Sequence, residues 1–189
     1  MRKKIHVWHL ELLARPLEPP PAEYALERVD IVLPEYARFL YLTVGAPWVW
    51  YMRLSWQYRH WRARFEDPRV ELWVATLKGA PLGYFELEAQ AGGSVEICYF
   101  GLVPEFIGQG HGKALLQDAI HKAWELAAGA PGAKRVWLHT CTLDHPNALS
   151  NYRARGFEVF REEDVEDNVP DRPIEPWTGA HKPTHPNQA

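Results

Sequence analysis

The sequence has few of the features that mark a secreted or membrane-bound protein. It contains two cysteines among 189 residues, Cys98 and Cys141, and both lie in apolar stretches. Disulfide frameworks need several paired cysteines, so we expect reduced thiols and a cytoplasmic protein. The basic segment Arg2-Lys3-Lys4 is followed by alternating residues, and no apolar run reaches the length of a membrane span. We therefore expect neither a signal peptide nor a transmembrane helix.

An excess of either charge is also lacking, because the formal net charge is only −3. Such a balance gives no electrostatic reason to expect nucleic acid or a membrane surface as a partner. Aromatic residues, in contrast, are abundant, with nine tryptophans, several of them before residue 62. Clustered tryptophans form core or line an apolar pocket.

The length and the hydrophobic pattern indicate one α/β domain. We expect strands at residues 5–13, 24–30, 70–77, 82–89, 94–103, 135–142 and 157–162. We expect helices at residues 34–44, 53–65, 111–128 and 146–155. The predicted domain covers residues 1–162, with an extra N-terminal strand within 1–22. Residues 163–189, acidic and then proline-rich, are predicted to form a tail.

A glycine cluster follows the strand expected at residues 94–103. The apolar run stops at Pro104, and Gly108, Gly110 and Gly112 precede a segment with helical periodicity. Glycine lets backbone N–H groups point outward together, and the first N–H groups of a helix have no intrahelical acceptors. The helix dipole favours negative charge at the same place, so this turn is a candidate phosphate site.

The glycine spacing excludes two kinds of nucleotide site. A Walker loop requires a glycine five residues before Gly112 and a hydroxyl after Lys113, but Ile107 and Ala114 occupy those positions. A dinucleotide fingerprint, G-x-G-x-x-G, fails from either Gly108 or Gly110.

The remaining pattern resembles the acyl-CoA turn of the GNAT superfamily of N-acetyltransferases, [Q/R]-x-x-G-x-[G/A] after a strand that ends in hydrophobic-x-Pro. Ile107 stands where that motif has Gln or Arg. A second match, to A-[IL]-x-x-Y-x-x-x-G-F, runs from Ala148 through Tyr152 to Phe157. The resemblance covers roughly residues 24 to 162.

This resemblance implies the GNAT acyl-CoA N-acyltransferase fold. That fold has a mixed, mostly antiparallel twisted sheet with helices on both faces and a splay between the fourth and fifth family strands. It also implies an acyltransferase that moves an acetyl group from acetyl-CoA to a primary amine of a small molecule, such as an amino acid, in a ternary complex and without a metal. An acyl-CoA-binding module without turnover and a protein or peptide N-acetyltransferase are the alternatives. Many members of the superfamily form homodimers.

The resemblance also indicates which residues hold acetyl-CoA. The turn would bind the pyrophosphate, the preceding strand would pair with the pantetheine arm, and the N–H of Leu102 would face the acetyl oxygen. His145 stands where members often have an Asn that bonds the pantetheine. The cofactor-binding residues implied are Phe100, Leu102, Val103, Ile107, Gly108, Gln109, Gly110, His111, Gly112, Lys113 and His145.

Two residues are candidates for proton transfer. Glu96 is the only acid in its strand and aligns with the glutamate that serves as base in histone-acetylating members, while Tyr99, Glu86 and His139 are alternatives. Strict alternation would place Glu96, Cys98 and Phe100 on one face, with Ile97 and Tyr99 on the other. Tyr152 matches the family tyrosine that protonates the departing thiolate, and a phenol is protonated at pH 7.

The segment between the first two helices is the candidate for acceptor recognition. Trp48 and Trp50 would form an aromatic wall beside Arg53, which would suit an amine that carries an apolar group and a carboxylate. Zinc bound by His139, Cys141 and His145, and a cysteine nucleophile with a histidine base, are weaker alternatives.

Overall fold

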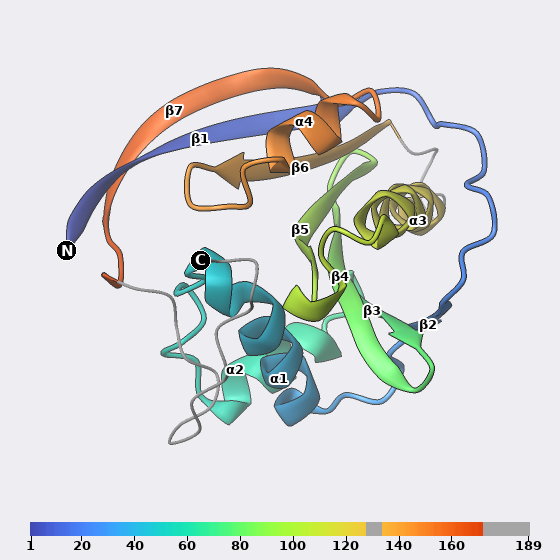
Figure 1. Cartoon of the computed structure of the whole chain (residues 1–189), viewed down its shortest axis with the longest axis horizontal. Coiled ribbons are helices and arrows are strands. Elements are labelled where there is room, and N and C mark those ends of the chain that lie inside the picture. Colours follow the sequence, from blue (N-terminus) through green and yellow to red (C-terminus); the bar gives the residue numbers. More distant parts are fainter. Residues whose placement is uncertain (128–133, 172–189) are drawn as a thin grey trace.

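A computed structural model describes residues 1–127 and 134–171. The described chain forms a seven-stranded sheet in the order β2-β3-β4-β5-β6-β1-β7 (Figure 1). Its strands are β1 Arg2–Leu12, β2 Ala25–Arg28, β3 Val70–Leu77, β4 Ala80–Gln90, β5 Ser94–Leu102, β6 Arg135–Cys141 and β7 Glu158–Asn168. The β5–β6 pair is parallel and every other neighbouring pair is antiparallel. The predicted element order and the mostly antiparallel sheet are confirmed.

Helices cover both faces of this sheet. On one face, α1 (Pro34–Gly45) and α2 (Tyr58–Glu66) pack on side chains of β3 and β4 such as Leu72 and Tyr84. On the other face, α3 (His111–Ala127) and α4 (Ala148–Arg153) pack around Phe85 and Leu138. Complete burial of one such side chain contributes about 1.5–3 kcal/mol relative to exposure. Two separate cores therefore hold β4 and β5 between them.

The central strands β5 and β6 separate soon after they begin. Their pairing covers only Ser94 to Glu96 on β5 and Arg135 to Trp137 on β6. Beyond Glu96 no described strand pairs with that edge of β5, while β4 pairs with the other edge as far as Leu102. The predicted splay is therefore present, and it leaves one edge of β5 open.

A β-bulge changes the faces that β5 presents. Glu86 pairs with Tyr99 and Leu87 pairs with Ile97, so Cys98 is an extra residue on β5. A bulge shifts every later side chain to the opposite face. Tyr99 therefore packs with the α1 and α2 core, and Phe100 packs with the α3 core. The strict alternation expected for Glu96 to Phe100 was wrong, because it assumed an unbroken ladder.

Two element boundaries also differ from the predictions. The β3–β4 turn contains only Lys78 and Gly79, with φ of 50° and 86°, instead of the four residues expected. Two residues with positive φ match the twist of a hairpin, so the strands can begin closer together. The second helix begins at Tyr58 and not at Arg53, because residues 51–56 form a turn in which the N–H of Trp56 bonds to the carbonyl of Arg53.

Strand β7 continues beyond residue 162, where we expected a tail to begin. Its acidic half pairs with β1, which supplies Arg2, Lys4 and His6 opposite the carboxylates. Cross-strand pairs of opposite charge stabilise such a ladder. The boundary prediction was wrong for residues 163–168. Residues 172–189, the rest of the expected tail, lie outside the described part.

None of the described helices is both long and apolar enough to cross a membrane.

Candidate active site

A cavity of about 720 Å³ occupies the gap between the separating strands β5 and β6. The glycine turn and α4 line one part of it. The segment 48–52, which follows α1, lines another part together with side chains from β1 and β7. The cavity therefore connects the expected cofactor site to the expected acceptor site.

The open edge of β5 supplies free backbone donors to this cavity. The N–H of Val103 donates to the carbonyl of Leu82 on β4 at 2.9 Å. Because successive N–H groups of an extended chain point to opposite edges, the N–H groups of Leu102 and Phe100 are directed away from β4, toward the gap. Both residues line the cavity.

Val103 does not fit its predicted role in cofactor binding. Its N–H is used by Leu82, its carbonyl accepts the N–H of Phe106, and its side chain is buried in the α1 and α2 core. Its N–H is therefore not free to donate to a ligand.

The turn between β5 and α3 presents backbone N–H groups. Gly108 and Gly110 have φ of 84° and 90°, values that favour glycine over any residue with a Cβ. The N–H of Ile107 is taken by the carbonyl of Pro104. The N–H groups of residues 108–112 have no acceptor within the part of the chain that the structure describes. Because unpaired N–H groups at a helix N-terminus favour anions, this turn is a candidate anion cradle.

The polar side chains of this turn differ in their positions. Lys113 lines the cavity. Gln109 donates through its amide to the carbonyl of Glu105 at 2.6 Å, which braces the turn from outside the cavity. His111 lies between Tyr24 and Phe106, with ring centroids 6.5 and 6.2 Å away, and does not line the cavity. Only Lys113 of the three is placed to contact a ligand there.

Tyr152 lies at the wall of the cavity. It is 8% exposed, and its ring contacts Phe100 edge-on at 6.4 Å. The structure gives no hydrogen-bond partner for its hydroxyl among the described residues. Burial raises the pKa of Tyr152, so the phenol stays protonated and can donate.

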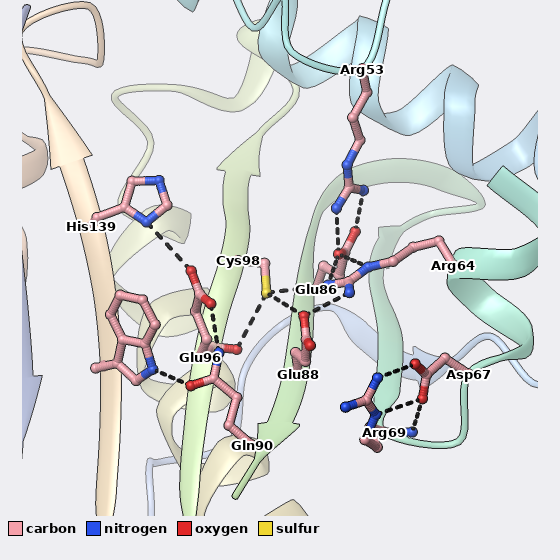
Figure 2. Close-up of polar contacts among 11 residues, drawn as sticks. Arg53, Arg64, Asp67, Arg69, Glu86, Glu88, Gln90, Glu96, Cys98 and His139 are labelled. Carbon is pink, nitrogen blue, oxygen red and sulfur yellow. Dashed lines mark hydrogen bonds and ion pairs between the residues drawn. The ribbon is translucent and has the colours of Figure 1, made fainter. Parts of the chain in front are cut away.

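Glu96 and His139 form a pair at the point where β5 and β6 diverge. The Nδ1 of His139 lies 3.4 Å from Oε1 of Glu96, and Oε2 of Glu96 accepts the amide N–H of Gln90 at 2.9 Å (Figure 2). Gln90 in turn accepts the indole N–H of Trp137 at 2.9 Å. His139 lines the cavity, whereas Glu96 lies behind it and does not.

The wall opposite the turn depends on two glycines. A Cβ on Gly45 would lie 2.3 Å from the ring of Trp50, and a Cβ on Gly101 would lie 2.5 Å from Val44. Glycine at these positions allows Trp50 and α1 to approach β5 closely. Trp50 and Trp48 both line the cavity.

His145 also lines the cavity, on the far side of the gap. Its ring contacts Trp48 edge-on at 5.0 Å, and its Nδ1 accepts the N–H of Asn147 at 3.0 Å. Neutral imidazole protonated at Nε2 can therefore donate a hydrogen bond to a ligand.

Arg53 is not available for the substrate carboxylate that the sequence suggested. Its side chain is 7% exposed, and Glu86 binds it through two N–H···O bonds of 2.6 and 2.7 Å (Figure 2). It also lies over the rings of Trp56 and Tyr99. Burial works against the charged guanidinium, but Glu86 outweighs it and raises the pKa of Arg53. The predicted substrate role is wrong because a buried carboxylate already neutralises Arg53.

The thiols are poorly suited to nucleophilic catalysis. Burial raises the pKa of Cys98, and it raises that of Cys141 to about 11. Thiolates, not thiols, are the nucleophiles, so neither residue is activated.

Residues of β1 and β7 also line the cavity, and sequence reasoning missed them. Ile5 and Val7 of β1 and Val165 of β7 line the cavity. Tyr51 donates to Oδ2 of Asp167 at 2.6 Å, which ties the segment after α1 to β7. No local sequence pattern signals this contact, because 116 residues separate its partners.

The family is established by comparison with known proteins. Residues 32–157 match the model described as the acetyltransferase (GNAT) family. The match covers more than half of the chain and includes the splayed strands, the glycine turn and Tyr152. The protein therefore belongs to the GNAT acetyltransferase family. No curated relative matches the chain by sequence.

Solved structures with the same fold share little sequence with this chain. A GCN5-related N-acetyltransferase from Sphaerobacter thermophilus is 21% identical with a TM-score of 0.63, covering 89% of this chain and 52% of its own. One from Kribbella flavida is 20% identical with a TM-score of 0.59, covering 85% and 56%. The ribosomal-protein-S18-alanine N-acetyltransferase from Escherichia coli is 16% identical with a TM-score of 0.55, covering 71% and 77%. The chain spans about half the length of the first two, and these similarities concern the fold.

Proposed function

We propose that this protein transfers an acetyl group from acetyl-CoA to the primary amine of a small molecule that carries an apolar substituent. The observation that carries the proposal is the continuous cavity between β5 and β6. Its lining includes glycines of the 108–112 turn, Phe100 and Leu102 of the open β5 edge, and the aromatic residues Trp48 and Trp50, which supports a site for two substrates.

The open edge of β5 would hold and polarise the thioester. The N–H groups of Phe100 and Leu102 are directed to the gap, as argued above from the Val103 hydrogen bond. One such donor aimed at a developing oxyanion is worth about 3–4 kcal/mol. The residue 108–112 cradle would take the pyrophosphate, with Lys113 and His145 as side-chain contacts.

Tyr152 would complete the transfer as general acid. Its protonated phenol lies at the cavity wall, and its hydroxyl has no described partner to compete with the departing thiolate. The Glu96–His139 pair would remove the proton from the amine.

The acceptor chamber favours an apolar amine over an amino acid. Trp48, Trp50 and Val165 line it, and Arg53 is held by Glu86 instead of facing the cavity. Because no guanidinium is free to pair with it, a carboxylate on the acceptor would be desolvated in the cavity without a compensating ion pair, which is unfavourable. Arylalkyl amines fit the lining better.

A thiol-release assay with acetyl-CoA tests this proposal. The panel would contain phenethylamine and tryptamine, the amino acids phenylalanine and tryptophan, polyamines, and a lysine peptide. We expect turnover with the arylalkyl amines and much lower kcat/KM with the matched amino acids, which differ by one carboxylate. Turnover with the peptide alone would mean a protein N-acetyltransferase. Acetyl-CoA binding without thiol release from any acceptor would mean a binding module.

A further inference from the structure

We propose that His139 is the general base that deprotonates the acceptor amine, and that Glu96 is its positioning residue. This assignment rests on the proposed transferase function and names a different base from the sequence prediction, which chose Glu96. Three geometric observations support it: which group reaches the cavity, how each group is held, and what surrounds the imidazole.

Only His139 of the pair reaches the cavity. Its side chain is 43% exposed and belongs to the cavity lining, whereas the Glu96 side chain is 14% exposed and does not. Figure 2 shows Nδ1 directed at Glu96 and the second ring nitrogen, Nε2, directed away from it. A base must come within hydrogen-bond reach of the proton it removes, and the imidazole stands between Glu96 and the cavity.

A chain of hydrogen bonds holds Glu96, and the other oxygen of its carboxylate lies 3.4 Å from His139. Trp137 donates to Gln90, Gln90 donates to Oε2 of Glu96, and Oε1 faces Nδ1 of His139. A carboxylate at Nδ1 keeps the proton there in the neutral ring and leaves Nε2 as the acceptor. The chain therefore fixes both the orientation and the tautomer that a base requires.

Groups on three other elements face the imidazole. Glu96 of β5 is closest, the ring of His9 on β1 is centred 6.0 Å away, and Asp144 follows β6. His9 is engaged by Glu163 of β7 at 2.8 Å. The Glu96 carboxylate, with a smaller contribution from Asp144, raises the pKa of His139 from its usual 6.5, although burial opposes this. The neutral base therefore forms as pH rises through that raised value.

The proton balance is complete with these groups. Nε2 of His139 takes one proton from the ammonium form of the acceptor and passes it to solvent. The free amine attacks the thioester, the C–N bond forms and the C–S bond breaks. The thiolate takes the phenol proton of Tyr152, and the second proton lost by the nitrogen restores that phenol. The products are the amide, CoA thiol and one proton.

The test is the pH dependence of kcat/KM, measured with one arylalkyl amine for every variant so that the amine's own titration is constant. His139→Gln should lower kcat/KM at least about 100-fold and remove the enzyme's acid limb. With Glu96→Gln, kcat/KM should still fall at low pH, but the fall should occur at lower pH. The reason is that the carboxylate that raises the pKa of His139 is gone. His9→Gln, a neighbouring histidine outside the cavity, should leave the profile unchanged.

The opposite pattern would overturn the assignment. If Glu96→Gln abolishes the fall of kcat/KM at low pH and His139→Gln retains it, Glu96 is the base. If His139→Gln retains the full rate and profile, His139 has no part in proton transfer. If wild-type protein releases no thiol with any amine, the proposed function itself fails, an outcome distinct from both. Acetyl-CoA binding to each variant verifies that the cavity remains intact.

Discussion

Replacing Glu86 with glutamine should destabilise the protein by about 3 kcal/mol. Glu86 is 1% exposed and accepts two hydrogen bonds from Arg53 and one from Arg64. Arg64 would keep its second carboxylate, Glu88, at 2.6 Å, but Arg53 has no other carboxylate within reach in the described chain. The variant therefore leaves one buried guanidinium without its counter-ion.

The size of the effect follows from leaving Arg53 buried while its carboxylate partner is removed. Removing one partner of a buried ion pair costs about 3–5 kcal/mol. Glutamine preserves the volume and one acceptor oxygen, and the rings of Trp56 and Tyr99 still lie against Arg53, so we expect the lower end. A loss of about 3 kcal/mol is a large share of the 5–15 kcal/mol that stabilises a typical domain.

Urea unfolding followed by tryptophan fluorescence measures this difference. The midpoint should fall with little change in slope, since the same surface is exposed on unfolding. Glu66→Gln is the matched control, because Glu66 pairs with Arg62 on the surface of α2 and should cost less than about 0.5 kcal/mol. A loss below 1 kcal/mol for Glu86→Gln would refute the reasoning that Arg53 depends on this carboxylate.

Three further variants, and Gly92→Ala as a control, test the site. Tyr152→Phe should lower kcat at least about 100-fold and leave the calorimetric affinity for acetyl-CoA unchanged; full activity would exclude the acid role. Gly110→Ala and Gly92→Ala both place a Cβ at positive φ and should each lose about 1–2 kcal/mol of stability, but only Gly110→Ala should raise the KM for acetyl-CoA. Gly45→Ala should displace Trp50, cost about 1–3 kcal/mol on unfolding and raise the acceptor KM; a wild-type acceptor KM would contradict that contact.

Local sequence patterns predicted most of the fold. Hydrophobic periodicity, together with Gly and Pro at element ends, was enough to predict the element order and the strand–turn–helix of the anion cradle. Glycine spacing excluded the other nucleotide sites. These features are local, so a single sequence contains them.

The errors that affect the site and the sheet involve partners distant in the chain. Arg53 was expected to face the carboxylate of an acceptor, because its actual partner, Glu86, is 33 residues away and no local pattern indicates it. The bulge at Cys98 exists only in relation to its pairing with β4. The acidic half of β7 looked like a solvated tail, because its charges are balanced by Lys4 and other residues of β1 at the opposite end of the sequence. Contacts between residues far apart in the sequence determine these features, and hydrophobic periodicity carries no information about such contacts.

The tie between Tyr51 and Asp167 has a practical consequence for anyone who engineers this protein. The family match ends at residue 157, yet β1 and β7 supply Ile5, Val7 and Val165 to the cavity wall. An expression fragment trimmed to the matched segment would retain the cofactor half and lose one wall of the acceptor half. We expect an exchange of β1 and β7 together between relatives to change this wall of the cavity and with it the preference for an acceptor.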